Sequence, residues 1–562
     1  MLHRTKNKEH TTEDIVRILL ENRGIKTKKQ KEEFFNPPDL EKLTSKDFGV
    51  DQNQLNKAVK RIKQAIEKDE KIIVYGDYDV DGISAAAILW ETLNSLGAKV
   101  IPYIPSRFTE GYGLSETGIK NLKLEIENCK PRFYRGKLLI TVDNGITAYE
   151  GLKFAKQQGL DVIVTDHHQP GDKQPAALAI IHSTQISGSA VAWILAREVI
   201  KNLKFKIKNY SRDHLGLVAL GTIADILPLV GINRGLVVHG LKVLRNSSRL
   251  GIRALCASAA VSQDSLDTYN IGFILGPRLN AMGRVDHAME SLRLLCTRNP
   301  QKASELARKL ESANHLRQEK TEAVVSHVES IHADPAWSDG NIPKLLYVYH
   351  ASYEEGVIGI AAGRLVDKYH RPAIVLSIGE EYSKASARSI SGVNILELLK
   401  KAGDGIFKSV GGHPMAAGFT IKTQDVELLG QRLNEISELE ISNEVLIKNV
   451  RIDCEINLLD ATEALLSQII KFAPFGFGNP EPAFETKGVN VLEMRLLGKE
   501  KNHLKMLVEK DGVTFTAIGF RMGEWYANLS PDLSVNIVYA VEENVWNGNK
   551  SLQLKLKSIT LS

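Results

Sequence analysis

Residues 71–89 read KIIVYGDYDVDGISAAAIL, and this stretch decides how the rest of the chain is interpreted. The apolar run that opens it predicts a buried strand, and the small residues that close it predict a helix. Between them lie Asp77, Asp79 and Asp81, and alternate side chains of an extended segment point the same way. Converging carboxylates repel one another unless a cation neutralises them. At the end of a buried strand, this pattern favours a divalent-metal site over a solvated acidic loop.

Candidate partners for this site occur in three later apolar runs, which we interpret as β-type. They are Asp143 after run 138–142, the triplet Asp166, His167 and His168 after run 161–165, and Asp225 in run 217–226. A lone buried Asp is more often a helix cap, and a lone pair of histidines is usually structural. Four such clusters in one α/β region are much harder to explain as packing. Six or more O and N ligands suffice for two ions, and imidazole among carboxylates favours Mn²⁺ over a pure Mg²⁺ cage.

These motifs are similar, in order, to the motif series of the DHH phosphoesterase superfamily, and more closely to the RecJ exonuclease family. DYDVDG, VDNG, DHH and Asp225 carry the first resemblance. Further motifs carry the second: PSR and EGYG within 105–113, GPRLNAMGR at 276–284, EGVIG at 355–359, SARS at 386–389, GGHP at 411–414 and PFGFGNPEP at 474–482. Because they span nearly the whole chain, the resemblance is specific.

The chain is expected to be an α/β protein of several domains. Strands alternate with helices after residue 71, which predicts a parallel sheet, and a helix from 300 to 332 would span about 50 Å and join two lobes. The resemblance implies a DHH parallel-sheet domain and a DHHA1 α/β domain joined by that long helix, plus a C-terminal OB-fold β-barrel. The expected sections are an N-terminal helical segment (1–50), a DHH catalytic domain (51–235), a helical connector (236–335), a DHHA1 domain (336–445) and an OB-fold nucleic-acid-binding domain (446–562).

Composition sets bounds on where the protein works. The chain has 562 residues, four widely spaced cysteines and a formal net charge of +5, which is too mild to indicate nucleic acid by itself. The cysteine spacing indicates a reducing compartment, with neither zinc nor disulfides. No apolar run reaches the ~18 residues of a membrane span, and no apolar segment follows the basic N-terminus. We therefore expect a cytoplasmic protein.

The resemblance implies hydrolysis of phosphodiester bonds with two ions, Mn²⁺ or Mg²⁺. The expected metal ligands are Asp77 and Asp79 for one ion, Asp81, His167 and Asp225 for the other, and Asp143 as the bridge. His168 is expected to contact the scissile phosphate or the departing oxygen, and Asp166 to orient a ligand imidazole. The expected catalytic residues are thus Asp143, Asp166 and His168.

The resemblance implies that a second set of residues binds the nucleic-acid backbone, and guanidinium groups and exposed polar loops suit anionic oxygens. The set is Arg107, Arg278, Asn280, Arg284, Arg364, Ser386, Arg388 and His413. The pair Arg278 and Arg284 is placed in a Gly-rich turn, and segments 384–391 and 411–413 are interpreted as loops. Outside the matched context, surface arginines in salt bridges are the commoner case.

The function implied is a 5′→3′ exonuclease that releases mononucleotides from single-stranded DNA, in DNA repair and recombination. The expected state is a monomer, with a single-strand-binding protein and a helicase as further partners. Two alternatives remain open: another DHH phosphoesterase acting on short RNA, cyclic dinucleotides or polyphosphate, and a non-catalytic single-strand-binding scaffold.

Overall fold

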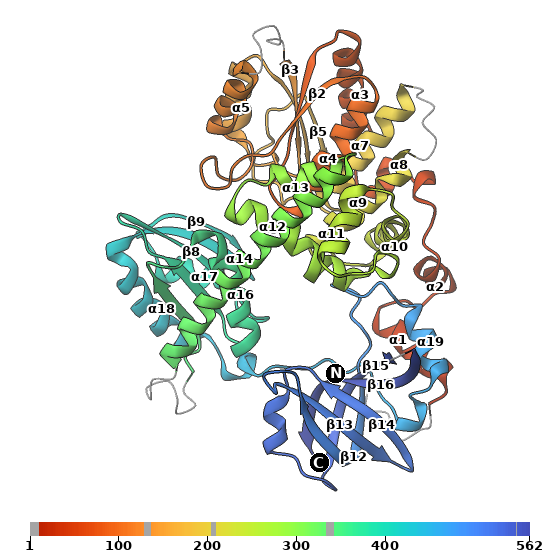
Figure 1. Ribbon diagram of the computed structural model, residues 1–562. Coiled ribbons are helices and arrows are strands. Elements are labelled where there is room, and N and C mark those ends of the chain that lie inside the picture. The colour runs from red at the N-terminus through yellow and green to blue at the C-terminus, as the bar shows by residue number, and fades with distance from the viewer. Residues whose placement is uncertain (1–9, 129–135, 204–209, 333–341, 547) are drawn as a thin grey trace.

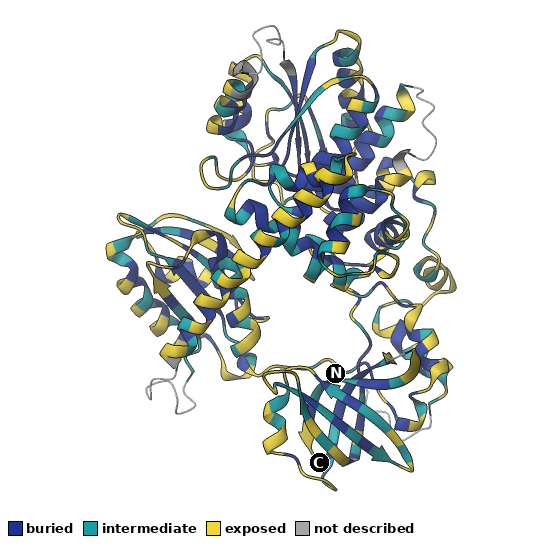
Figure 2. Ribbon diagram, viewed as in Figure 1, coloured by how far each residue is buried: buried dark blue, intermediate teal, exposed yellow. Residues whose placement is uncertain are grey.

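The computed structural model describes residues 10–128, 136–203, 210–332, 342–546 and 548–562. Strands of these residues form three sheets, and each sheet is the centre of one lobe (Figure 1). Figure 2 shows that the strands of the first lobe are mostly buried, whereas the strands of the barrel and the outer helices also carry exposed residues. Among the described residues, we find no helix with the length and apolar character needed to cross a membrane.

The first lobe is built on a five-stranded parallel sheet in the order β2-β1-β3-β4-β5. The strands are β1 (Lys71–Tyr75), β2 (Lys99–Tyr103), β3 (Gly136–Val142), β4 (Asp161–Asp166) and β5 (Ala179–His182). The helices between them are α4 (Val80–Ser95), α5 (Glu116–Asn128) and α6 (Tyr149–Gln157), while α3 (Gln52–Glu67) precedes β1 and α7 (Gly188–Asn202) follows β5. Because the strands are parallel, their carboxyl ends meet at one edge of the sheet.

A helical section shares the hydrophobic core of this first lobe. It contains α9 (Leu215–Ala224), α10 (Gly231–Arg245), α11 (Leu250–Ser258), α12 (Gly276–Val285), α13 (Met289–Cys296) and α14 (Pro300–His332). The predicted long helix is confirmed, since α14 has 33 residues and joins the first lobe to the second. The β-type interpretation of run 217–226 was wrong, because this apolar run is the buried helix α9.

The second lobe has the mixed sheet β6-β7-β8-β10-β9. Its elements are β6 (Leu346–His350), α16 (Glu355–Tyr369), β7 (Ala373–Ser377), β8 (Tyr382–Arg388), α17 (Ile395–Ala402), β9 (Phe407–His413), β10 (Ala416–Lys422) and α18 (Val426–Glu440). Two predicted loops were wrong here. Residues 384–388 belong to β8 and residues 411–413 to β9, and both strands pair with β10.

The third lobe is a closed barrel, because β12 pairs with both β13 and β15. Its strands are β11 (Cys454–Glu455), β12 (Phe484–Leu497), β13 (His503–Lys510), β14 (Val513–Gly519), β15 (Ser534–Trp546) and β16 (Asn549–Leu561). The N-terminal helix α1 (Thr12–Asn22) lies beside α19 (Glu463–Ile470) and buries Ile15 and Leu19 in the core of the barrel. Helix α2 (Lys28–Phe35) then leads toward the first lobe.

Candidate active site

The first acidic cluster lies where β1 ends and α4 begins. Asp77 follows the strand, and Asp79 is the N-cap of α4, where its carboxylate accepts a hydrogen bond from the Gly82 backbone N–H (3.0 Å). A Cβ on Gly82 would lie 2.6 Å from the Cβ of Asp77. Only glycine therefore lets the first turn of α4 pack against the strand end and hold Asp77 and Asp79 together.

The segment from Asp77 to Asp81 is not extended throughout, contrary to the prediction. The chain becomes helical at Val80, so Asp81 lies in the first turn of α4. Its carboxylate accepts hydrogen bonds from the backbone N–H groups of Gly188 (2.6 Å) and Ser189 (3.0 Å) at the start of α7. The three acids are consequently divided between two neighbouring groups.

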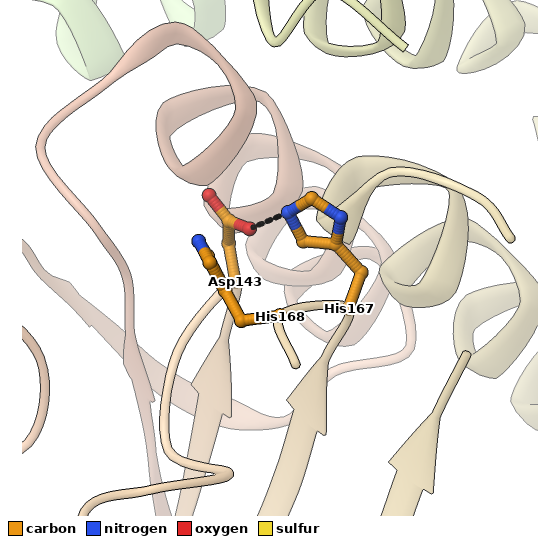
Figure 3. Close-up of side chains that lie close together, drawn as sticks. All are labelled: Asp143, His167 and His168. Atoms are coloured by element: carbon orange, nitrogen blue, oxygen red, sulfur yellow. Dashed lines mark ion pairs between the residues drawn. The ribbon is translucent and has the colours of Figure 1, made fainter. Parts of the chain in front are cut away.

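Three overlapping sets of potential metal ligands meet at this edge of the sheet, and within each set the ligand atoms lie within 4.8 Å of one another. Two of them match the expected ligands of the two ions, namely Asp77, Asp79 and Asp143, and Asp81, His167 and Asp225. The third consists of Asp143, His167 and His168. Asp143 belongs to the first set, and its Oδ1 also lies 3.2 Å from His167 Nε2 of the second (Figure 3). The structure thus brings together all six predicted ligands, with Asp143 between the two sets.

Asp143 is held in an unusual backbone conformation. Its φ is 62°, in the left-handed region that non-glycine residues rarely adopt. A Cβ on Gly188 would lie 2.3 Å from Asp143 Oδ1, so the start of α7 approaches the carboxylate closely. Such strain persists where the surrounding structure fixes a functional geometry.

Two buried atoms show that the site fits a cation. Asp143 Oδ1 and His167 Nε2 face each other, and neither has a hydrogen-bond partner among the described residues. Buried polar atoms are nearly always paired, so this arrangement needs an explanation. Carboxylate oxygens with one imidazole are donors that suit Mn²⁺ and also Mg²⁺.

The electrostatics of the site also fit a bound cation. Burial, reinforced by neighbouring carboxylates, raises the pKa of Asp77 and of Asp143 well above the usual range and raises the pKa of Asp225 to about 8. Burial lowers the pKa of His167 and favours the neutral imidazole, which is the form that binds metals. Bound cations would reverse the cost of ionising these acids.

His168 has a different environment from His167. Its Nδ1 lies 2.8 Å from Asp166 Oδ1, and its Nε2 lies 3.1 Å from the hydroxyl of Tyr112. Burial disfavours the charged ring, but the hydrogen bond and the charge of Asp166 outweigh it and raise the pKa of His168 to about 9. The side chain of Asp166 therefore orients the ring of His168. Asp166 Oδ1 also accepts a hydrogen bond from the backbone N–H of His167 (2.7 Å), and its role toward a ligand imidazole stays a prediction.

A cavity of about 280 Å³ opens beside the first set of acids. It is lined by Asp77, Tyr78, Asp79, Arg107, Tyr112, His168, Asn280, Gly283 and Arg284. Burial and the nearby charge of Arg107 lower the pKa of Arg284 to about 10, so two guanidinium groups line this wall of the cavity. The cavity therefore offers acids on one side and positive charge on the other.

Sequence reasoning missed two residues of this cavity, Tyr78 and Tyr112. The guanidinium of Arg107 lies 5.2 Å from the centre of the Tyr78 ring, which holds the arginine over the cavity. Tyr78 stands between Asp77 and Asp79 in the quoted motif, and Tyr112 stands in the EGYG motif. Their positions inside the matched motifs were the sequence signal that could have identified them as residues of the cavity.

The other predicted phosphate-binding residues fall into two groups. Arg388 donates a hydrogen bond to Ser386 Oγ (3.0 Å), and the charge of Arg107 contributes, after burial, to lowering the pKa of Arg388. Neither Ser386 nor Arg388 lines the cavity, and the same is true of Arg278, Arg364 and His413. Arg278 forms a bidentate ion pair with Glu311, Arg364 pairs with Glu322, and His413 lies exposed on β9. The Gly-rich turn predicted for Arg278 and Arg284 was wrong, since both lie on α12.

Comparison with known proteins agrees with this geometry. Three family models match the chain: the DHH family N-terminal domain over residues 71–222, the DHHA1 domain over 343–438 and the RecJ OB domain over 452–558. The single-stranded-DNA-specific exonuclease RecJ of Bacillus subtilis is 36% identical over 98% of this chain and 68% of that protein. The RecJ exonuclease of Haemophilus influenzae is 34% identical over 90% of each chain.

A solved structure shows the same architecture. The crystal structure of RecJ in complex with Mn²⁺ from Thermus thermophilus matches 98% of this chain and 76% of that chain, with a TM-score of 0.81 and 27% identity. Fold and site together define a metal-dependent phosphoesterase of the DHH class. Within this class, the chain belongs to the RecJ family of single-stranded-DNA-specific exonucleases.

Proposed function

We propose that the protein is a metal-dependent 5′→3′ exonuclease that removes 5′-mononucleotides from single-stranded DNA. The observation that carries this proposal is the pair of ligand sets joined at Asp143 beside a cation-lined cavity. Exonuclease activity on single strands is shared by its named relatives. The polarity rests on the family resemblance.

Different side chains would hold the two metal ions. Asp77 and Asp79 would hold one ion, Asp81, His167 and Asp225 the other, and Asp143 both. Two divalent ions bound there would supply an activated water and neutralise negative charge on the phosphate oxygens. The chain itself fixes these ligands by the backbone contacts of α4 and α7.

The residues around the cavity act on the substrate. His168, held protonated by Asp166, is placed to donate a proton to the departing oxygen or a hydrogen bond to the phosphate. Arg107 and Arg284 supply positive charge for a terminal phosphate. Asn280 fixes the wall, because its side-chain oxygen accepts a hydrogen bond from the Val80 N–H (3.0 Å) at the start of α4.

Oligonucleotides labelled at either end test the proposal. With Mn²⁺, a 5′-labelled single strand should release its label as a mononucleotide from the first time points, and a 3′-labelled strand should shorten stepwise. EDTA should stop both reactions, and a blunt duplex should resist. Release that begins at the 3′ end, or equal digestion of the duplex, would contradict the proposal. A parallel arm with short RNA and a cyclic dinucleotide tests the alternative substrates, and the C-terminal barrel favours the longer DNA strand.

We also propose that the protein works in the cytoplasm as a monomer, in DNA repair and recombination, alongside a single-strand-binding protein and a helicase. The cytoplasmic location is inferred from the cysteine spacing and the lack of long apolar runs in the sequence, and the other proposals follow from the family resemblance. Light scattering of the purified protein tests the monomer, and co-purification with each tagged partner tests the association.

A further inference from the structure

The loop between β2 and α5 carries Arg107 to the cavity, and a neighbouring acid that does not line the cavity holds this loop closed. The acid is Glu110. Its carboxylate accepts a hydrogen bond from the hydroxyl of Tyr103 at the end of β2 (2.8 Å) and one from the Ser106 backbone N–H (3.4 Å). The Glu110 N–H donates in turn to the Ser106 carbonyl (2.9 Å). Arg107 therefore belongs to a closed turn that is anchored on a strand end.

Further hydrogen bonds fasten the same loop to β1 and α5. The Ser115 hydroxyl donates to the Glu110 carbonyl (3.2 Å) and accepts from the Gly118 N–H (3.0 Å) in the first turn of α5. The hydroxyl of Tyr75, at the end of β1, donates to the Gly113 carbonyl (3.2 Å). A Cβ on Gly118 would overlap the Tyr75 hydroxyl oxygen and lie 3.1 Å from Glu110 Oε2. The contacts that hold the loop thus share one tightly packed volume.

The two tyrosines use their hydroxyl groups in this loop. Tyr75 and Tyr103 are 0% and 3% exposed, and their rings lie 5.3 Å apart in the core of the first lobe. Phenylalanine would supply the same apolar ring, and a buried hydroxyl is unfavourable unless it is hydrogen-bonded. The hydroxyl groups are therefore explained by the loop that they hold.

The position of Glu110 leaves the charge of Arg107 available to the cavity. The carboxylate oxygens of Glu110 accept from Tyr103 and Ser106, and in the described part of the chain no ion pair joins Glu110 to Arg107. The guanidinium of Arg107 lies instead over the ring of Tyr78, 5.2 Å from its centre. A guanidinium in this position can donate two hydrogen bonds to a phosphate.

We propose that Glu110 is a positioning residue that holds Arg107 in place for the terminal phosphate of the strand, with Tyr103 as its anchor on β2. This inference rests on the proposed function. Arg107 contacts the phosphate, and Glu110 and Tyr103 act only through Arg107. Binding costs conformational entropy, and a loop that is already fixed lowers this cost. The terminal phosphate therefore contributes more to binding while the hydrogen bond between Tyr103 and Glu110 is intact.

Two strands that differ only at the 5′ end test the proposal. Both are 12-nucleotide single strands with a fluorescent label at the 3′ end, and one carries a 5′-phosphate where the other carries a 5′-hydroxyl. Their binding is measured in EDTA, and the wild type should prefer the phosphorylated strand. Tyr103→Phe should reduce this preference roughly 3- to 10-fold and leave binding of the 5′-hydroxyl strand unchanged. Tyr149→Phe, which removes a hydroxyl bonded to the Lys173 carbonyl (2.8 Å) in the same lobe, is the matched control and should keep the full preference.

Combined variants show whether Glu110 and Tyr103 act through Arg107. Glu110→Ala should reduce the preference as Tyr103→Phe does, because both remove the same hydrogen bond. Arg107→Ala should reduce it at least as far, and adding Tyr103→Phe to Arg107→Ala should cause no further loss. A merely structural defect would weaken binding of both strands equally and would add to the effect of Arg107→Ala. Circular dichroism and the thermal midpoint establish that each variant is folded.

Three results would overturn the positioning role. They are a wild type that binds the two strands equally, a Tyr103→Phe variant with the full preference, and a loss in Tyr103→Phe that is the same with and without Arg107. The proposed function fails separately. If the wild type prefers the phosphorylated strand in EDTA yet never hydrolyses it with Mn²⁺, the exonuclease is wrong and the binding comparison still decides the role of Glu110. If the strand is degraded but Tyr103→Phe keeps the full preference, the positioning role is wrong and the exonuclease stands.

Discussion

At the residue scale, Asp143 is the side chain on which both ligand sets depend. Its left-handed φ of 62° and its contact with the start of α7 aim one carboxylate between Asp79 and His167. Asparagine adopts a left-handed conformation readily, so a change to Asn removes the charge and retains the backbone.

Asp143→Asn should therefore abolish activity in a folded protein. Losing the shared charge costs several kcal/mol of transition-state stabilisation, which corresponds to at least about a 1000-fold lower kcat/KM. The measurement is Mn²⁺-dependent release of mononucleotides. Asp172→Asn removes an exposed acid outside both ligand sets and should leave the rate unchanged. Turnover by Asp143→Asn within tenfold of the wild type would remove the proposed centre.

The raised carboxyl pKa values predict how metal and pH act together on stability. A carboxyl whose pKa is higher in the folded protein contributes stability below its unfolded pKa, near 4, and loses it as pH rises through the folded pKa. For Asp225 that value is about 8, and for Asp77 and Asp143 the shift has the same direction. The metal-free protein should thus lose stability between pH 6 and pH 8.5.

Metal ions should restore the stability that the protein loses as the pH rises, because protons and cations compete for the same carboxylates. We expect Mg²⁺ to raise the thermal midpoint more at pH 8.5 than at pH 6, measured by calorimetry against EDTA. The difference should shrink in Asp143→Asn. A shift that is equal at both pH values, or larger at pH 6, would contradict the assignment.

The structure brings together the metal ligands expected from the sequence, but the sequence predicted only part of their arrangement. The rule that ligands gather at the carboxyl ends of strands correctly grouped Asp77, Asp143 and His167. Asp81 lies with His167 and Asp225 as expected, but it does so from the first turn of a helix, because the capping bond of Asp79 starts α4 where alternation assumed an extended chain. Tyr112 was not assigned a role, since its contact with His168 joins residues 56 positions apart.

At the element scale, α4 carries two ligands at its N-terminus and is anchored near its other end by Glu91. The carboxylate of Glu91 accepts hydrogen bonds from Arg249 (2.6 and 2.7 Å) and from His214 Nε2 (2.8 Å). Burial opposes ionisation, but these bonds and charges outweigh it and lower the pKa of Glu91 to about 2. One acid thus ties α4 to the starts of α9 and α11.

Glu91→Ala should lower the free energy of unfolding by about 3 kcal/mol, because removing one partner of a buried ion pair leaves buried charge without its carboxylate. Chemical denaturation gives the value. Glu440→Ala, which breaks an exposed pair with Lys401, should cost less than about 1 kcal/mol. Equal losses in the two variants would show that Glu91 has no special role.

Helices and strands were predicted well where the length or composition of a segment determines its secondary structure. They were predicted poorly where tertiary contacts determine it. The long helix α14 was predicted from its apolar spacing. Run 217–226 was interpreted as β-type, because a short buried apolar run carries no periodicity that separates helix from strand. The small residues of 384–388 and the glycines of 411–412 are strands because β10 pairs with both, and local sequence does not encode that pairing.

At the scale of the whole molecule, Arg234 of α10 connects the first lobe to the barrel lobe. Its guanidinium donates hydrogen bonds to the carbonyl oxygens of Phe34 (2.8 Å), Phe472 (2.9 Å) and Ala473 (2.8 Å), and it lies 3.9 Å from the centre of the Phe34 ring. A charged donor strengthens each of these bonds.

Arg234→Ala should loosen the barrel from the first lobe, because three backbone carbonyls lose their shared donor. We expect a thermal midpoint lower by a few degrees and faster proteolysis between the lobes, measured by calorimetry and limited trypsin digestion. Arg212→Ala, which removes an exposed arginine paired with Asp39 and Glu41, is the control. Identical digestion of the two variants would argue against this role for Arg234.

The central claim is that two cations bind at one edge of the first sheet and share Asp143. Anomalous diffraction at the manganese edge, from crystals grown with Mn²⁺, tests it most directly. The account predicts two peaks about 3.5–4 Å apart, one bound by Asp77, Asp79 and Asp143 and the other by Asp81, Asp143, His167 and Asp225. A single peak, or peaks bound by other residues, would contradict it.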